Sequence, residues 1–201
     1  MDYRQILDFW LGELADGFAS VTKRKQWFEA SDGLDQQIRD LFAGTLQDIA
    51  NGSHKDWLVK PKSRLAYIIV CDQFSRNIHR GSDKAFATDE IALEVSREGI
   101  QQGFDQELAI DEKCFFYLPF EHSEDVVDQH AVVGLYSQLR DETPQGNKHI
   151  TGNYLRFGQI HRDIIQKFGR FPHRNQVLGR ESTAAELEHI ATGQNFGQPG
   201  S

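Results

Sequence analysis

Apolar residues recur every three to four positions along almost the whole chain, and this spacing constrains the fold more than any other feature. Ile6, Leu7, Trp10 and Leu14 follow it near the N-terminus, and residues 150–168 follow it over several turns. Such spacing places apolar side chains on one face of an α-helix. The sequence shows no strand-like alternation bounded by hairpin turns. We therefore predict an all-α protein of about eight to nine helices, packed as antiparallel pairs in a bundle or superhelix.

Start and stop signals divide this pattern into separate helices. Pro119 is expected to end the apolar helix 111–118, and Ser123 is expected to cap the helix that follows. Near the C-terminus, Thr183 and Glu186 match a capping box. The predicted helices cover residues 6–14, 34–49, 61–70, 89–102, 111–118, 124–136, 150–168 and 184–192.

Size and charge narrow the classes of partner. A chain of 201 residues can be organised by one hydrophobic core. We predict a single helical domain over residues 1–193, followed by a loose tail over residues 194–201, which lack periodicity. The 30 acidic residues outnumber the 22 Lys and Arg, which gives a formal net charge of -8. Because this charge repels a phosphate backbone, we expect no nucleic-acid partner.

The cysteines and the N-terminal residues indicate in which cellular compartment the protein is expected. Cys71 and Cys114 lie far apart in apolar surroundings, which is typical of buried, reduced thiols and not of a thiolate zinc site. The N-terminus has no basic region followed by an apolar one, and no apolar run reaches the length of a membrane span. We therefore expect a cytoplasmic protein with no membrane partner. No feature of the sequence indicates an oligomeric state.

A first polar segment, residues 72–81, follows the helix that Pro61 opens. Asp72 and Arg76 stand four residues apart, as do Gln73 and Asn77, so all four share one edge of a helix. They are candidate ligand-binding residues. The alternative is an ordinary ion pair beside an asparagine that helps to end the helix.

A second polar segment, residues 167–175, repeats the arginine–asparagine pair as Arg174 and Asn175. Arginine presents a planar fork of donors that suits a carboxylate or a phosphate, and asparagine adds a donor and an acceptor. If both pairs converge, they form an anion pocket. Two unrelated helix-end caps remain the alternative.

A third segment combines Glu121, His122 and Asp125. Such a set could bind a metal, position a general base, or pair with the arginines. The helical di-metal pattern needs two Glu-x-x-His repeats and two more carboxylates, and the chain has one such repeat. We therefore predict no metal and no cofactor. The candidate catalytic residues are His122, Glu121 and His173.

His161 is the last candidate, because it shares a helix face with Ile164 and Ile165. It is either a satisfied core histidine or part of the lining of the same pocket. The sequence contains no phosphate-cradling glycine loop, nucleophile elbow or dinucleotide fingerprint.

Four segments in order resemble the bacterial family called domain of unknown function 924. They are DQFSRN at 72–77, AFATD at 85–89, YLPFEHSE at 117–124 and FGRFPHRN at 168–175, with further similarity at 6–10 and 178–183. The chain departs from the family pattern at Ser75, where the family has proline. The resemblance implies an all-α fold similar to the tetratricopeptide-like superfold, and it implies no established activity.

Two functions from different classes follow from these observations. The first is a small-ligand protein that binds an anionic molecule in a polar pocket, with hydrolase-like acid/base chemistry as an extension. The second is a protein-interaction module that binds a peptide or partner on a concave helical surface. A pocket requires the polar segments to lie close together, whereas an interaction surface spreads them along several helices.

Overall fold

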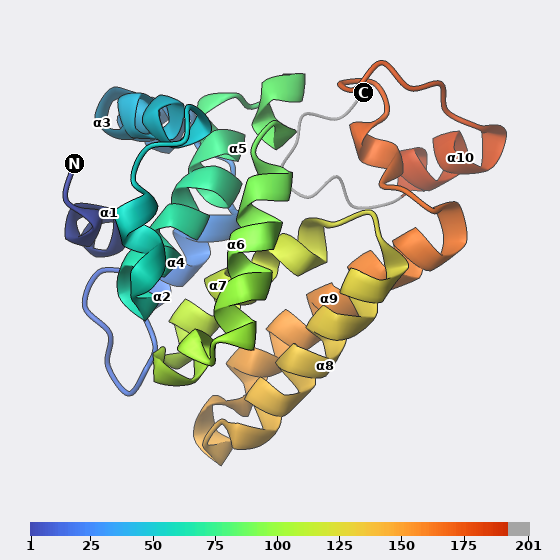
Figure 1. Cartoon of the computed structure of the whole chain (residues 1–201). Coiled ribbons are helices and arrows are strands. Elements are labelled where there is room, and N and C mark those ends of the chain that lie inside the picture. The colour runs from blue at the N-terminus through green and yellow to red at the C-terminus, as the bar shows by residue number, and fades with distance from the viewer. Residues whose placement is uncertain (193–201) are drawn as a thin grey trace. The chain divides into compact units, whose positions relative to one another are not determined.

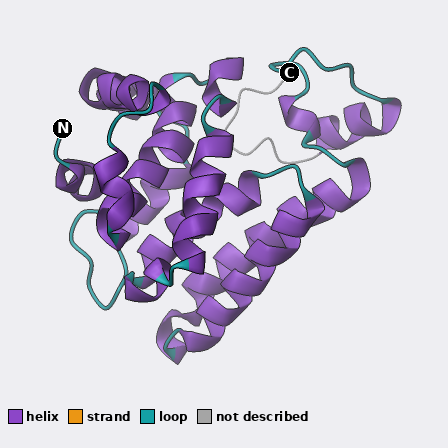
Figure 2. Ribbon diagram, in the orientation of Figure 1, coloured by secondary structure: helices purple, strands orange, loops and turns teal. Residues whose placement is uncertain are grey.

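A computed structural model describes residues 1–192, which consist of helices joined by loops and turns and contain no β-strand (Figures 1 and 2). The predicted all-α class is confirmed. The α-helices are α1 (Tyr3–Trp10), α2 (Val21–Phe28), α3 (Asp32–Ala50), α4 (Pro61–Ile69), α5 (Ser75–Ile78), α6 (Asp89–Gln101), α7 (Ile110–His122), α8 (Val126–Glu142), α9 (Lys148–Phe168) and α10 (Ala184–Thr192). A π-helical turn, Val70–Phe74, joins α4 to α5. The shorter 3-10 turns are η1 (Lys55–Val59), η3 (Asp83–Phe86), η4 (Phe104–Glu107), η5 (Gln145–Asn147) and η6 (Pro172–Arg174).

The described residues form two compact units. Unit 1 is Met1–Phe116, and unit 2 runs from Tyr117 to the last described residue, so the boundary falls inside α7. The single domain expected over residues 1–193 stays a prediction. The expected loose tail, 194–201, lies outside the described residues.

Unit 1 is built around aromatic side chains. Phe74, at the end of the π turn, is fully buried; its ring stacks on Phe42 of α3 at 4.7 Å and meets the edge of Trp10 of α1 at 5.4 Å between centroids. The helix predicted to reach Leu14 ends at Trp10. Burying rings of this size contributes most of the hydrophobic stabilisation of such a core.

Helix α2 has no counterpart among the predicted helices. Its one buried residue is Trp27, whose indole N–H donates to the carbonyl of Trp10 at 2.8 Å. Three consecutive basic residues, Lys23 to Lys25, interrupt the apolar spacing. The helix therefore lacks the amphipathic pattern that identifies the others, and a single tryptophan anchors it.

The end of α7 differs from the prediction. Pro119 lies inside α7, which continues to His122. A proline inside a helix removes one backbone hydrogen bond, but residues 111–121 are all buried, and packing on every side holds this helix together. The side-chain amide of Gln129 donates to the carbonyl oxygens of Glu121 and Ser123, both at 2.7 Å, and so satisfies acceptors at the end of the helix.

The cap of α8 also differs from the prediction. Asp125 is the N-cap, because its carboxylate accepts from the N–H of Val127 at 2.7 Å. The predicted cap, Ser123, instead accepts from the N–H of Asp125 and donates to Asp128. Two capping residues that stand two positions apart compete here, and the carboxylate fits the positive end of the helix better than a hydroxyl does.

Helices α8 and α9 of unit 2 form an antiparallel pair joined through η5 (Figure 1). Helix α9 ends at Gly169, which takes the left-handed conformation with φ +70°. At the end of the chain, Glu186 accepts from the N–H of Thr183 at 2.7 Å, and the Thr183 hydroxyl accepts from the N–H of Glu186. The predicted capping box is confirmed.

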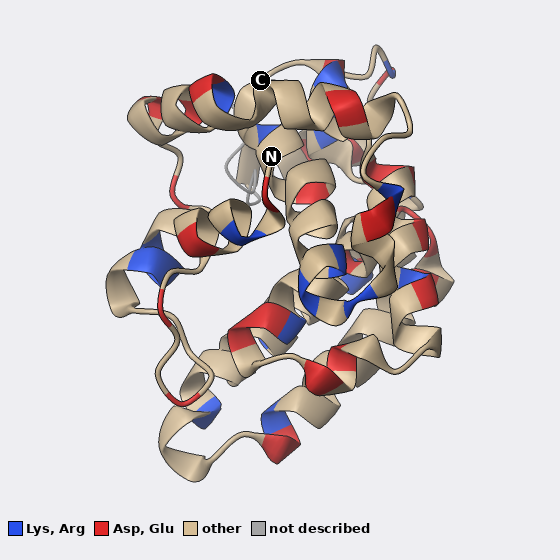
Figure 3. Cartoon of the chain, turned by 60° about the vertical axis from the view of Figure 1, so that its left-hand side comes forward, with Lys and Arg blue, Asp and Glu red and all other residues tan. Residues whose placement is uncertain are grey.

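The distribution of charged and apolar residues characterises the helices further. Acidic and basic residues lie close together on many of the helices (Figure 3). Among the helices within residues 1–192, none combines the length and the apolar character that crossing a bilayer requires. The superhelical, tetratricopeptide-like arrangement stays a prediction.

Candidate functional site

Unit 2 brings several of the candidate residues together. Glu121 and His122 lie at the end of α7, His161 lies in the middle of α9, and His173 and Arg174 lie in η6. We call these five residues the histidine–arginine cluster. Of these, Glu121, His161 and Arg174 are buried, and the other two are partly exposed.

His161 is held by two acceptors at the same nitrogen. Its Nδ1 lies 3.0 Å from a carboxylate oxygen of Glu121 and 2.9 Å from the carbonyl oxygen of Phe157. Because both partners accept, Nδ1 carries the hydrogen, and Nε2 is the basic nitrogen of the neutral ring. A carboxylate paired with a histidine in this way fixes the tautomer and the orientation of the ring.

The ring of Phe171 contacts three members of the cluster, His161, His173 and Arg174. Its fully buried ring lies 5.4 Å from the His161 ring and 5.5 Å from the His173 ring, and the guanidinium carbon of Arg174 lies 4.4 Å from its centroid. The ring of His122 lies 6.4 Å from that of His161. The guanidinium on the aromatic face is a cation–π contact.

The pKa of His173 is strongly lowered. Burial, followed by the positive charges of Arg174, His161, His122 and His189, lowers the pKa of His173 from 6.5 to about 3. His173 is therefore neutral at physiological pH. The groups that act on its charge come from α7, α9, α10 and η6, and all of them disfavour the protonated form.

Glu124 ties the segment 171–180 to the start of α8. It accepts from the N–H of Phe171 at 2.7 Å and from both terminal nitrogens of Arg180, at 2.7 and 3.0 Å. Burial acts to raise the pKa of Glu124, but these hydrogen bonds and the charge of Arg174 outweigh it and lower the pKa. Glu124 is therefore an ionised carboxylate beside two arginines.

Asn175 follows Arg174 directly and is buried. Its amide nitrogen donates to the hydroxyl of Ser182 at 3.0 Å, while its Oδ1 is buried with no hydrogen-bond donor among the described residues. A buried amide oxygen without a donor costs free energy. Asn175 therefore has an acceptor to offer to a ligand or a water molecule.

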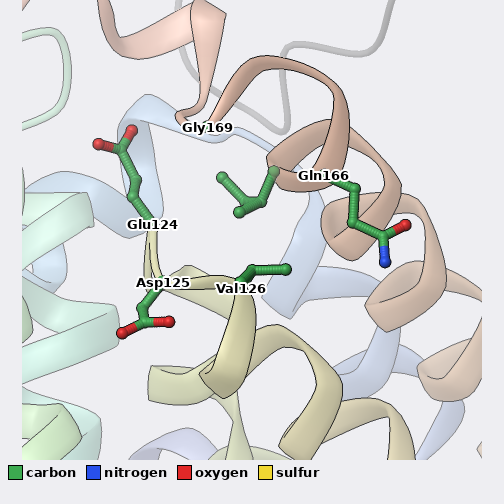
Figure 4. A pocket seen from close by; sticks show the side chains of 6 residues that line it. Glu124, Asp125, Val126, Gln166 and Gly169 are labelled. Atoms are coloured by element: carbon green, nitrogen blue, oxygen red, sulfur yellow. The ribbon is translucent and has the colours of Figure 1, made fainter.

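An open surface pocket of about 660 Å³ lies between the start of α8 and the end of α9 (Figure 4). The walls are acidic, polar and apolar, formed by Glu124, Asp125, Val126, Ile165, Gln166 and Gly169. Asp125 is exposed, and its carboxylate already caps α8. Of the two carboxylates of the pocket, Glu124 already binds Arg180, and Asp125 already accepts from the N-terminus of α8.

The first predicted segment lies in unit 1, where Arg76 binds carboxylates. Its guanidinium donates to both oxygens of Asp89, at 2.8 and 2.9 Å, and to a carboxylate oxygen of Asp72 at 3.1 Å. Burial acts to lower the pKa of Arg76, but the two carboxylates outweigh it and raise the pKa. Gln73 also donates to Asp72, at 2.5 Å. These contacts fasten the π turn to α6.

Asn77 takes part in a second carboxylate contact of unit 1. Its amide donates to Asp35 of α3 at 2.8 Å, and Arg80 donates to both oxygens of the same carboxylate. Burial acts to raise the pKa of Asp35, and the hydrogen bonds from Arg80 and Asn77 outweigh it and lower the pKa. The ligand-binding role of Asp72, Gln73, Arg76 and Asn77 stays a prediction.

The chain matches the model of a protein family over residues 6–194. The family is described as bacterial protein of unknown function (DUF924). The chain belongs to this family. It is similar to a solved structure of a protein of unknown function, ATU0120 from Agrobacterium tumefaciens, with 34% sequence identity and a TM-score of 0.76. The similarity covers 95% of this chain and 97% of the other. No curated protein matches the chain.

Several residues of this DUF924 site did not emerge from the sequence. Phe171, Arg180 and His189 act on the cluster or on its frame, and residue 124 entered the prediction only as the first position of a helix. Glu124 and Arg180 stand 56 positions apart, so no local spacing relates them. Within residues 1–192, no group of three or more His, Cys, Asp or Glu has an arrangement that could hold a metal ion.

Proposed function

We propose that unit 2 of this DUF924 protein binds a small anionic molecule, a phosphate or a carboxylate, at the histidine–arginine cluster. The observation that carries the proposal is the convergence of Arg174, His161 and His173 on the buried ring of Phe171, with His122 beside His161. Each of these groups can donate a hydrogen bond to an anion once the histidines carry the required proton. Burial strengthens such contacts, because the local dielectric constant is lower than that of water.

The frame of the cluster supports a binding role. Glu124 holds the backbone at Phe171 and the side chain of Arg180, so η6 is fixed before any ligand arrives. A fixed frame lowers the entropy cost of binding. The buried acceptor of Asn175, next to Arg174, adds a group that can bind a hydroxyl of the same ligand.

The cluster also suits acid/base chemistry. Glu121 holds His161 with the hydrogen on Nδ1, which makes Nε2 the nitrogen that accepts or returns a proton. This is the arrangement of a general base oriented by a carboxylate. We propose His161, supported by Glu121, as the proton-transfer group of a hydrolase-like reaction, with His122 and His173 as its neighbours.

The second candidate is a protein-interaction role for the acidic pocket. Val126 and Ile165 give it an apolar wall, while Glu124 and Asp125 supply carboxylates. This combination fits a lysine or arginine side chain of a peptide, with its aliphatic stem on the apolar wall and its charge beside Asp125. The geometry of the cluster favours the first candidate, because His161, His173 and Arg174 all contact the same buried ring, Phe171.

Thermal unfolding in the presence of inorganic phosphate, pyrophosphate and citrate tests the anion site. The wild type should gain thermal stability with at least one of these anions, by about 2.7 kcal/mol at a hundredfold excess over the dissociation constant. Arg174→Gln should abolish the gain, and His122→Gln should reduce it. Arg156→Ala serves as the matched control, because Arg156 is an exposed arginine of the same unit.

A wild type that none of these anions stabilises contradicts the proposal. So does an Arg174→Gln variant that folds, by circular dichroism, and still responds fully. If Arg174→Gln does not fold, the half-buried His122 decides, because its replacement removes a donor without leaving a buried charge unpaired. A response of the Glu124 and Asp125 resonances to a lysine-rich peptide, without any response to anions, supports the second candidate instead.

A further inference from the structure

The groups proposed to bind the ligand differ in their exposure. His122 and His173 are partly exposed, whereas Arg174 and Asn175 are only 7% and 1% exposed. A ligand therefore reaches the two buried groups only if the atoms that cover them move aside. The segment that covers these groups decides how the ligand enters.

Residues 181–192, which we call the lid segment, lie directly against these buried groups. The hydroxyl of Ser182 accepts from the amide nitrogen of Asn175 at 3.0 Å. Helix α10 packs mainly on η6, the turn that contains Arg174. The lid segment therefore covers the side of the cluster on which Arg174 and Asn175 lie.

Few apolar contacts hold α10 in place. Of its nine described residues, Glu186 alone is buried, and Leu187 is 57% exposed. The helix therefore gains little hydrophobic stabilisation, whereas α8 and α9 bury large apolar side chains such as Tyr136 and Ile164. Segments with few buried apolar contacts are the ones that open most readily in a native protein.

Arg170 supplies most of the polar contacts that keep the lid segment closed. Its guanidinium donates to both carboxylate oxygens of Glu186, at 2.7 and 2.9 Å, and to the carbonyl oxygen of Glu181 at 2.8 Å. The Arg170 side chain is 30% exposed, so water competes for these hydrogen bonds and weakens them. Directly before the lid segment, Arg180 is held by Glu124. The lid segment can therefore move without disturbing the frame of the cluster.

We propose that the lid segment opens to admit the ligand to Arg174, and that the ion pair between Arg170 and Glu186 sets how often it opens. The inference rests on the proposed function, because it describes how the ligand of that site enters. Opening breaks this ion pair and the hydrogen bond between Ser182 and Asn175. It therefore releases a guanidinium and an amide, which can bind the ligand as well.

Hydrogen exchange of the wild type tests the opening without any ligand. Amide hydrogens of α10 should exchange about tenfold faster than those in the middle of α9, because α10 opens without global unfolding. Glu186→Gln should accelerate the exchange of α10 further. Glu188→Gln is the matched control at an exposed position of the same helix, and it should not change the exchange.

The association rate of an anion tests whether the ligand enters through the opened lid segment. The probe is whichever of inorganic phosphate, pyrophosphate and citrate stabilises the wild type most, and line shapes in proton–nitrogen correlation spectra give its association rate constant. If entry requires the open state, this constant rises with the population of that state. Glu186→Gln should therefore raise it by the same factor as its hydrogen exchange, about tenfold. Glu188→Gln should leave it unchanged.

Ser182→Ala provides a second variant in case Glu186→Gln does not fold. It removes the hydroxyl that accepts from Asn175, so it should also raise both the exchange of α10 and the association rate constant. Its effect should be smaller, because the ion pair between Arg170 and Glu186 stays in place.

The two proposals fail in different ways. If none of the three anions binds, the anion site is wrong and the lid segment has no ligand to admit. If an anion binds at the same rate to the wild type and to a variant whose α10 exchanges faster, the ligand enters by another route. The anion site then stands and the lid is wrong. Equal protection of α10 and α9 in the wild type would also overturn the lid.

Discussion

Single residues decide how closely the helices approach each other, and Gly99 of α6 is the tightest case. A Cβ atom added to Gly99 would lie 2.5 Å from the ring of Phe116 and 2.8 Å from the side chain of Arg64. Phe116 is fully buried and cannot move aside. Gly99 is therefore required by packing, although alanine is the better helix former.

Gly99→Ala should destabilise unit 1. Overpacking a buried site costs about 1–3 kcal/mol, which exceeds the gain of about 1 kcal/mol in helix propensity. Gly134→Ala is the matched control, because Gly134 lies in α8 with no atom within 4 Å of its added Cβ. That variant should gain about 0.5–1 kcal/mol. Urea unfolding measures both, and equal effects of the two substitutions would contradict the close approach.

His173 predicts a pH dependence of stability in the absence of any ligand. Its pKa is about 3 in the folded chain and 6.5 in the unfolded chain, so only the unfolded chain takes up this proton between these values. Stability is then fully present above pH 6.5 and is lost as the pH falls toward 3. One proton gives a loss of about 1.4 kcal/mol per pH unit, so about 2 kcal/mol disappears between pH 6.5 and pH 5.

Urea unfolding of the wild type and His173→Gln at pH 7, 6 and 5 measures this effect. The variant should lose clearly less stability over that range than the wild type. Parallel pH profiles for the two proteins would show that His173 is not held neutral by the fold.

At the scale of elements, α10 depends on one carboxylate. Glu186 is buried, accepts from the N–H of Thr183 and binds Arg170 through two hydrogen bonds, at 2.7 and 2.9 Å. The hydrogen bonds from Arg170 and Thr183 lower the pKa of Glu186 to about 2. One side chain therefore both caps the helix and attaches it to the residue after Gly169.

Glu186→Gln should loosen α10 without affecting α8 and α9. An amide is a weaker partner for Arg170 than a carboxylate, so amide hydrogens of α10 should exchange about tenfold faster. Glu188→Gln, at an exposed position of the same helix, should leave exchange unchanged. Equal exchange in the two variants would mean that other contacts hold α10.

Helix ends were the elements that local sequence predicted least well. Pro119 reads as a stop, yet α7 passes through it because neighbours bury the helix on every side. Ser123 reads as a cap, yet Asp125 takes the role. Each local preference is worth about 1–3 kcal/mol. Packing outweighs it at Pro119, and at Ser123 a second capping residue, Asp125, takes the position.

At the scale of the whole molecule, buried carboxylates predict acid sensitivity. The pKa values of Asp35, Glu124 and Glu186 are lowered from their ordinary 3.8 or 4.5. Burial acts to raise each of them, but hydrogen bonds from arginine side chains and neighbouring donors outweigh it. A group with a lowered pKa stabilises the fold above its unfolded value and loses that contribution as the pH falls through its folded value.

The chain should therefore lose further stability below about pH 4.5, in addition to the loss assigned to His173. Glu186→Gln combined with Glu124→Gln should lower stability at pH 7 and flatten the profile between pH 4.5 and pH 2. Thermal unfolding in this range measures it. A double variant with the slope of the wild type would assign the acid sensitivity to other carboxylates.

The sequence by itself determined the helical class, most helix positions, the capping box of α10 and the family. These depend on local spacing and short motifs, which act within a few residues. It also singled out Glu121, His122, His161, His173 and Arg174 as polar residues worth grouping. Only the tertiary structure decided which of them meet, because contacts such as Glu121–His161 and Glu124–Arg180 join residues 40 to 56 positions apart. The same holds for the two arginines: Arg76 resembles Arg174 in sequence, but folding places two carboxylates on Arg76 and the ring of Phe171 beside Arg174.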